Sequence, residues 1–136
     1  MKELNTIGLD QEKAENLAKK LNTLLSNYSI FYQNTRGFHW NIQGDKFFEL
    51  HLKFEEIYND LLLKIDEIAE RILTLGYTPE HRYTEYSKSS TIKESDKVTD
   101  GHTAVAQILD SLKIVIVMQR AILELANDAN DEGTNA

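Results

Sequence analysis

Apolar residues recur at steps of three or four along three long stretches of this chain, which is the spacing of one face of an α-helix. The first stretch runs from about Asp10 to Trp40, and its apolar face carries Leu17, Leu21, Leu24, Tyr28, Phe31, Thr35 and Phe38. The second runs from about Lys46 to Leu75, with a seam of Phe47, Leu50, Phe54, Ile57, Leu61, Ile65, Ile68, Ile72 and Leu75. The third starts near Thr99 or Asp100 and contains Val105, Ile108, Leu109, Leu112, Val115, Ile122 and Leu123.

Short polar segments separate these predicted helices. Residues 41–44 are typical of a turn, and we expect Asp45 to cap the second helix. Gly76 predicts the end of that helix, because glycine adopts the left-handed conformation there at little cost. Residues 77–98 are polar, so we expect a loop with one short helix near Tyr83–Ser87. The apolar pattern of the third helix ends at the polar residues 127–133.

Three amphipathic helices of this length predict an all-α helical bundle, since each apolar stripe needs a neighbour to cover it. A chain of 136 residues with 41% hydrophobic content fits a single domain, which we assign to residues 1–136. One proline and six glycines are too few for the many turns of a strand-rich fold. Residues 134–136 resemble the cap of a further helix that does not follow, so we expect part of the bundle surface to be uncovered.

Composition narrows the possible chemistry. The absence of cysteine excludes disulfides, zinc–thiolate sites and thiol nucleophiles, and it is consistent with a cytoplasmic location. We find no signal-peptide core and no stretch long enough to span a membrane. The net charge of −7 disfavours nucleic-acid binding, which needs a concentrated positive surface. Excess acid can serve ordinary solubility or attract metal cations, and only specific ligands can decide between these two interpretations.

Two of the four histidines lie among apolar residues, at positions 39 and 51, whereas His81 and His102 lie in polar surroundings and are interpreted as surface groups. His51 and Glu55 are four positions apart, so they share one face of the second helix. Two further carboxylates repeat this spacing on the apolar side of the helix, at Asp66 and Glu70. A buried carboxylate is costly unless it is paired or binds a metal. The alternative is that this second pair is solvated or pairs with nearby cations, Lys64 or Arg71.

Distances along the second helix indicate a site shared between two chains. On a straight helix His51 and Glu70 are roughly 28 Å apart, and Glu55 and Asp66 roughly 16 Å, so no single metal centre spans either gap. An antiparallel twofold pairing of two copies places His51 opposite Glu70 and Glu55 opposite Asp66 in the same register, because both pairs of numbers add to 121. Such an interface creates two equivalent sites. Imidazole and carboxylate ligands without sulfur suit iron, zinc or manganese.

Several motifs resemble those of the Dps family of mini-ferritins. They are the segment Tyr32-Gln33-Asn34-Thr35-Arg36-Gly37-Phe38-His39-Trp40-Asn41, the segment Phe47-Phe48-Glu49-Leu50-His51, and the segment Asp66-Glu67-Ile68-Ala69-Glu70-Arg71. The resemblance covers the chain from about residue 10 to its end. It implies a ferritin-like four-helix subunit that forms twofold dimers and a twelve-subunit shell, although this chain lacks the family's last long helix.

The same resemblance implies a ferroxidase that binds iron(II), oxidises it with hydrogen peroxide in preference to oxygen, and stores the ferric product against oxidative stress. One subunit would supply His39, His51 and Glu55, and its partner Asp66 and Glu70, with Glu70 bridging up to two irons; zinc could substitute. The Glu-x-x-His pattern of ferritins with a site inside one subunit is absent.

Other residues allow two interpretations. Trp40 is either a packed interface aromatic or a redox-active neighbour of the site, and Tyr58 is interpreted as a core residue. Asp131 and Glu132 resemble acidic residues of the family's iron-entry pores, or else they form a solvated helix end. DNA binding is an alternative function because many relatives coat DNA through a basic tail, but the first ten residues contain only one lysine. A structural module without activity is a third possibility.

Overall fold

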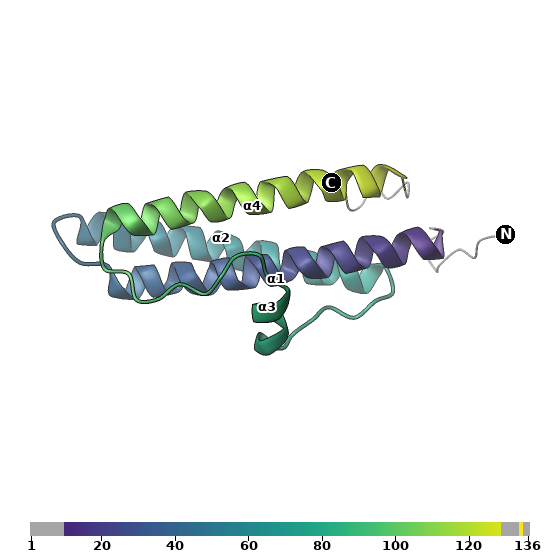
Figure 1. Ribbon diagram of the computed structural model, residues 1–136, viewed down its shortest axis with the longest axis horizontal. Helices are drawn as coiled ribbons and strands as arrows, with labels where there is room; N and C mark the ends of the chain where they lie inside the picture. Colours follow the sequence, from purple (N-terminus) through teal and green to yellow (C-terminus); the bar gives the residue numbers. More distant parts are fainter. Residues whose placement is uncertain (1–9, 129–133, 135–136) are drawn as a thin grey trace.

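The computed structural model describes residues 10–128 and residue 134, and these residues form four α-helices. The helices are α1 (Gln11–Asn41), α2 (Phe47–Thr74), α3 (Tyr83–Ser89) and α4 (Gly101–Asp128). Figure 1 shows the three long helices side by side, with α3 on the outer side of α1. The described part of the chain contains no β-strand, so the predicted all-α fold and its short helix in the connection are confirmed.

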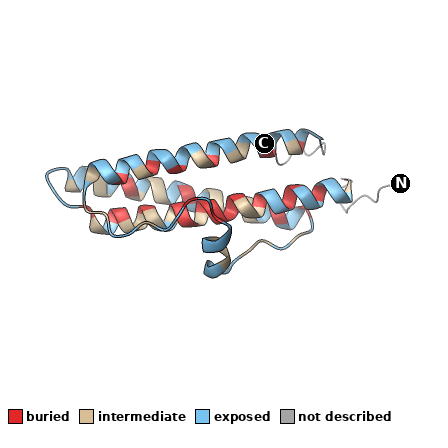
Figure 2. Cartoon of the chain, in the orientation of Figure 1, coloured by how far each residue is buried: buried red, intermediate tan, exposed pale blue. Residues whose placement is uncertain are grey.

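Helix α1 forms the centre of the bundle because α2, α3 and α4 all pack against it. Its buried side chains therefore lie on more than one face, as the red segments of Figure 2 show. Leu17, Leu25 and Phe31 are at most 1% exposed. Burying an apolar side chain of this size contributes about 1.5–3 kcal/mol. The core thus lies between α1 and its neighbours.

Local capping explains where the helices begin and end. The carboxylate of Asp10 accepts hydrogen bonds from the backbone N–H groups of Glu12 and Lys13, which caps α1. At the end of α2, Gly76 has a φ of 91°, in the left-handed region, as predicted for a helix stop. The carboxylate of Asp100 accepts hydrogen bonds from the backbone N–H and the hydroxyl of Thr103, at 2.9 and 2.7 Å, and these bonds hold the pKa of Asp100 below its usual value.

The predicted cap of α2 is wrong by one residue. The N-cap position is Lys46, not Asp45, and no side chain caps this helix end. The turn is closed by a hydrogen bond from the Phe47 backbone N–H to the Gly44 carbonyl, and Gly44 has a φ of 105°. The first helical bond then runs from Leu50 to Lys46. The glycine turn therefore shifts the start of the helix past the aspartate.

Three asparagines on α1 anchor the connection between α2 and α4. Asn22 bonds to Thr78 and Glu80, while Asn34 bonds to the backbone of residues 93 and 95. Asn27 is fully buried, and its side-chain oxygen accepts from the Thr91 and Ile92 backbone N–H groups, both at 3.0 Å, and from the Ser90 hydroxyl at 3.1 Å. The bond from the Ile92 N–H satisfies a buried backbone group, and the other bonds fix the connection along α1.

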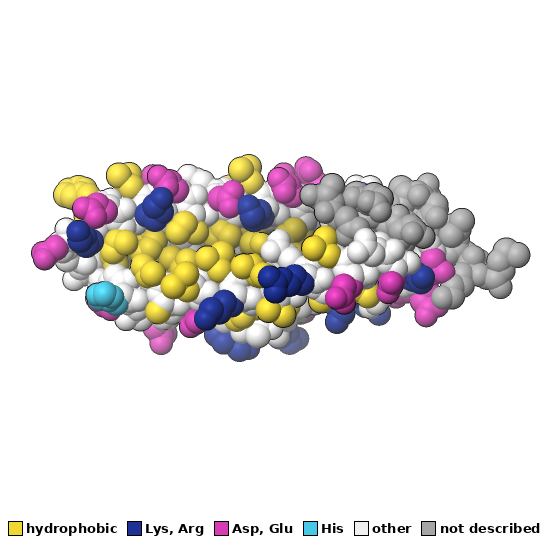
Figure 3. All heavy atoms as spheres, turned by 90° about the horizontal axis from the view of Figure 1, so that it is seen from above, with side chains coloured by type: hydrophobic (Ala, Val, Ile, Leu, Met, Phe, Trp, Pro, Cys, Tyr) yellow, Lys and Arg dark blue, Asp and Glu magenta, His cyan; other side chains and the backbone are white. Residues whose placement is uncertain are grey.

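One side of α4 is exposed, as expected for a bundle with an uncovered apolar face. Four positions that the sequence assigned to the apolar face of this helix are at least 38% exposed, and they are Val105, Leu109, Leu112 and Leu123. They are not core residues because α4 packs on α1 through the adjacent stripe of Ile108, Val115 and Ile122. Figure 3 shows the hydrophobic side chains gathered along this face.

A shallow groove of about 280 Å³ lies between α2 and α4, and Tyr28 of α1 lines it together with Leu61 and Ile108. Burial raises the pKa of the Tyr28 phenol, the charge of Asp60 raises it further, and a hydrogen bond with Gln119 partly offsets both effects. Among the described helices, none is both long and apolar enough to cross a bilayer.

The role of Asn27 can be tested by removing its amide. We expect Asn27→Ala to lower the free energy of unfolding by about 2–4 kcal/mol, because the change leaves the buried Ile92 N–H and the part-buried Thr91 N–H without an acceptor. Chemical denaturation followed by circular dichroism measures this loss. The matched control is Asn16→Ala on the exposed side of α1, which should change stability by less than about 0.5 kcal/mol. Equal stability of the two variants would show that Asn27 is not an anchor.

Candidate metal site

His39 of α1 and His51 of α2 form a reciprocal pair at one end of the bundle. Their rings stack with centroids 3.7 Å apart and an angle of 16° between the planes. The Nδ1 atom of His39 lies 2.6 Å from the His51 carbonyl oxygen, and the Nδ1 atom of His51 lies 2.8 Å from the His39 carbonyl oxygen. His39 is only 7% exposed, and His51 is half-buried. The sequence predicted both residues as ligands but gave no sign of this mutual contact.

The two hydrogen bonds indicate which ring nitrogen carries a proton in each histidine. A carbonyl oxygen can only accept, so each Nδ1 atom must donate and carry a proton. In the neutral ring the lone pair then resides on Nε2. Nε2 is therefore the atom that each histidine would present to a metal, while the Nδ1–H groups are held by the backbone of the neighbouring helix. This second hydrogen bond is the usual way in which a protein orients a metal-binding imidazole.

Two aromatic rings complete the surroundings of the histidine pair. Tyr58 meets His39 edge-on, with centroids 5.3 Å apart, and Phe47 stacks on His51 at 5.0 Å. Tyr58 is half-buried rather than a fully enclosed core residue. These contacts restrict the rotation of both imidazoles. The sequence did not indicate these ring contacts, because nothing in the pattern distinguishes Tyr58 and Phe47 from other apolar positions.

Trp40 follows His39 in sequence but faces a different direction. Successive residues of an α-helix are rotated by about 100°, so neighbouring side chains diverge. The Trp40 ring is 55% exposed, and the Arg36 guanidinium lies over it at 4.7 Å. Arg36 also lies 5.4 Å from the ring centre of Tyr32. Trp40 is thus on the outer surface of α1 and contacts Arg36 in this chain.

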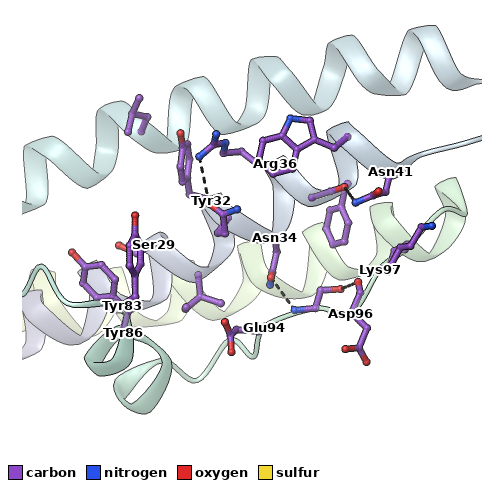
Figure 4. A pocket seen from close by; sticks show the side chains of 18 of the residues that line it. Ser29, Tyr32, Asn34, Arg36, Asn41, Tyr83, Tyr86, Glu94, Asp96 and Lys97 are labelled. Carbon is purple, nitrogen blue, oxygen red and sulfur yellow. Dashed lines mark hydrogen bonds between the residues drawn. The ribbon is translucent and has the colours of Figure 1, made fainter.

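A groove of about 590 Å³ runs along this outer surface, between α1 and the connection that follows α3. Figure 4 shows Tyr32, Arg36 and Tyr83 from its wall. Its lining also includes Leu62 of α2 and the indole of Trp40, but neither histidine of the stacked pair. The groove is therefore separate from the histidine pair.

The outer face of α2 carries a second stripe that the sequence seam did not include. Its members follow one another at mostly helical steps and are all exposed or half-buried: Phe48, His51, Leu52, Glu55, Asn59, Leu62, Leu63, Asp66, Glu70 and Leu73. We call this set the α2 stripe. Its four leucines are between 47% and 64% exposed. The sequence could have indicated this stripe, because its leucines and its carboxylates follow one another at helical steps of three or four residues.

The predicted burial of Asp66 and Glu70 is wrong for the single chain, because both lie exposed on the α2 stripe instead of facing α1. The exposed positions fit the alternative interpretation in which this carboxylate pair is solvated, whereas the Lys64 ammonium bonds to Asp60 instead, at 2.7 Å. In the described part of the chain, no hydrogen bond or ion pair engages the carboxylates of Glu55, Asp66 or Glu70. These three groups remain available as ligands.

The structure keeps the two halves of the predicted ligand set apart. The helix α2 is continuous from Phe47 to Thr74, so His51 and Glu70 lie at well-separated levels of one rod. No group of three or more metal-ligating side chains forms within the described residues of one chain. His81 and His102 are exposed, as expected. Asp131 and Glu132, the predicted pore residues, lie outside the described residues.

Comparisons with known proteins decide the family. The model of the ferritin-like domain matches residues 18–136. A Dps protein from Vibrio cholerae, described as a member of a broad superfamily of ferritin-like diiron-carboxylate proteins, superposes with a TM-score of 0.95 at 55% identity, over 96% of this chain and 82% of that one. A DNA protection during starvation protein from Porphyromonas gingivalis is 43% identical, over 96% of this chain and 82% of its own length. The chain belongs to the Dps family of ferritin-like proteins.

The Dps fold extends to more distant relatives. Dps from Staphylococcus aureus is 32% identical and superposes with a TM-score of 0.84, over 88% of this chain and 80% of that chain. Membership of the Dps family confirms the resemblance seen in the sequence motifs. It supports a general role in iron storage and protection, while the ligands and the reaction need their own evidence.

Proposed function

We propose that this chain oxidises iron(II), with hydrogen peroxide as the preferred oxidant, and stores the ferric product. The site is shared by two chains: His39, His51 and Glu55 come from one copy, and Asp66 and Glu70 from the other. The observation that carries this proposal is the reciprocal histidine pair, because the backbone carbonyls engage the Nδ1 atoms and not the Nε2 atoms. Imidazole and carboxylate ligands suit iron, and zinc could compete for them.

The α2 stripe supports the pairing of two copies. In the antiparallel register that places His51 opposite Glu70, Phe48 lies opposite Leu73, and these two side chains are 78% and 60% exposed. Exposed leucines at this density are typical of a surface that is buried in an assembly. A twofold contact between α2 helices would cover them and would complete two metal sites at once. We therefore expect a homodimer as the smallest active unit and a twelve-subunit shell as the storage form.

The proposed reaction balances with two irons at the site. Two iron(II) ions give one electron each to hydrogen peroxide, which takes up two protons and becomes two waters. The carboxylates of Glu55, Asp66 and Glu70 offset the charge of the incoming cations and stabilise the iron(III) products more strongly than iron(II). Glu70 would be the carboxylate that bridges two irons if it approaches both histidines of the other copy. Asp131 and Glu132 are proposed to guide iron toward the interior.

Removing one ligand from either half should slow iron oxidation strongly while the helices remain intact. We expect His51→Ala and Asp66→Ala each to lower the rate of ferric absorbance after addition of iron(II) and peroxide by about 10- to 100-fold, the usual range for an altered metal site. The control is Glu67→Ala, which removes a neighbouring exposed carboxylate outside the α2 stripe. If His51→Ala and Asp66→Ala oxidise iron at the parent rate, the ligand assignment is wrong.

Mixing the two inactive variants tests whether the site is shared. In a dimer that contains one His51→Ala chain and one Asp66→Ala chain, one site has lost both ligands and the other has kept both. Random assembly should therefore restore about a quarter of the sites, because half of the dimers are mixed and each regains one site. Co-refolded protein is assayed against each variant refolded alone. An absence of recovery in verified mixed dimers would place the whole site within one chain.

DNA binding remains the alternative, since several relatives are named for DNA protection. The 15 Lys and Arg are outnumbered by 22 Asp and Glu, so the net charge of −7 opposes binding to the DNA phosphates. We expect gel-shift titrations to show no complex that survives moderate salt. A complex that persists under those conditions would favour the DNA-protecting function.

A further inference from the structure

Arg36 of α1 is a cation that aromatic rings hold in place. Its guanidinium lies 4.7 Å from the ring centre of Trp40 and 5.4 Å from that of Tyr32, and Figure 4 shows it beside Tyr32. It donates a long hydrogen bond of 3.5 Å to the side-chain oxygen of Gln33. Within residues 10–128 and residue 134, no acidic side chain forms an ion pair with it. The ring contacts restrict the motion of the guanidinium but leave its charge without an anionic partner.

The guanidinium lies on the side of α1 that borders the α2 stripe. Arg36 lines the outer groove together with Leu62, which belongs to this stripe. The stripe also carries the carboxylates of Glu55, Asp66 and Glu70, which have no ion-paired partner in the part of the chain that the structure describes. Each chain thus presents one unpaired cation beside a face with three unpaired anions. Such charges become complementary when two copies of this face meet.

Ring contacts between α1 and α2 show how the two helices align. His39 stacks on His51, with centroids 3.7 Å apart, and Tyr32 meets Tyr58 edge-on at 5.8 Å. The residue numbers in both facing pairs add to 90, so the helices are antiparallel and keep one alignment across about two turns. This alignment gives the level along α2 at which any residue near the end of α1 lies.

The alignment places Arg36 close to one carboxylate of the second copy. Within its own chain Arg36 lies at the level of residue 54. In the antiparallel pairing of two α2 helices, that level faces residue 67 of the other copy. Asp66 is one residue away, or about 1.5 Å along the helix axis, and it belongs to the α2 stripe. Glu67 lies outside the stripe, because successive residues are rotated by about 100°.

We propose that Arg36 of one copy pairs with Asp66 of the other while the shared site is empty, and that it releases this carboxylate when iron(II) binds. The inference rests on the proposed function, because it needs the shared site and its register. In an empty site three carboxylates would meet without a cation and repel one another. The guanidinium offsets part of this charge and stabilises the metal-free contact. The same guanidinium weakens metal binding, since iron must displace it.

The absence of cysteine from the chain allows a direct test of this contact. The double variant Arg36→Cys/Asp66→Cys is assembled with a chelator and treated with bis-maleimidoethane. Within one chain the two positions differ in level by twelve residues, about 18 Å, which this reagent cannot span. We therefore expect a covalent dimer on a denaturing gel. The matched control is Arg36→Cys/Glu67→Cys, whose second cysteine lies on another face of α2, and it should give several-fold less product.

The effect on the site is measured with zinc(II), which has no redox chemistry and suits the same ligands. Arg36→Gln removes the charge but keeps a polar side chain. We expect it to bind zinc about 3- to 10-fold more tightly than the parent in calorimetry of the assembled protein, because no guanidinium competes for Asp66. Loss of a purely structural residue would weaken binding instead. Arg36→Lys keeps the charge, so its affinity should stay closer to that of the parent.

The metal-free contact between copies should respond in the opposite direction. We expect sedimentation of Arg36→Gln in chelator to show a dissociation constant about 3- to 10-fold higher than that of the parent, and this difference should shrink at high salt. Arg120→Gln is the matched control, because this exposed arginine lies on α4 and not beside the α2 stripe. It should match the parent in both sedimentation and zinc affinity.

The outcomes distinguish this proposal from the function on which it rests. If Glu55→Cys/Asp66→Cys cross-links between chains but Arg36→Cys/Asp66→Cys does not, the shared site is supported and the role of Arg36 is rejected. A zinc affinity of Arg36→Gln equal to or weaker than that of the parent also rejects this role. If neither cysteine pair cross-links, the antiparallel pairing is wrong and both proposals fail.

Discussion

The stiffness of α2 is the constraint on which the rest of the structure depends. A continuous helix rises by about 1.5 Å per residue and cannot fold back on itself. It therefore holds His51 and Glu70 at separate levels, although the two residues suit one metal centre. The exposed leucines and available carboxylates of the α2 stripe have a common explanation if a second copy of α2 lies against this face. In that case the same contact between two subunits would bury the leucines and bring the metal ligands together.

Helix α1 supplies the fixed frame for this contact. It carries the core of the bundle and, near its C-terminal end, His39. The histidine is held by packing, by the His51 carbonyl and by the edge of Tyr58, so the orientation of its ring is fixed within the single chain. Asn27 anchors the long connection on the same helix. Helix α1 therefore carries both the bonds that stabilise the fold and one histidine of the candidate site.

Much of the fold could be predicted from the sequence because its causes are local. The spacing of apolar residues indicated three long helices, Gly76 marked the end of α2, and the polar stretch before α4 allowed the short helix α3. The error at Asp45 is also local in origin, since the glycine turn before it adds residues ahead of the first helical bond. Side-chain chemistry at fixed spacing was enough to select His51 and Glu55 as neighbours, and the family motif to select His39.

The sequence by itself determined which residues belong to each helix and which chemical groups each helix offers, because these depend on near neighbours in the chain. Only the tertiary structure decided where those groups point. It placed Asp66 and Glu70 on the exposed face of α2, left one side of α4 uncovered, and brought Tyr58 against His39. Periodicity defines a face of a helix, but the packing of other helices decides which face is buried, and that information is not local.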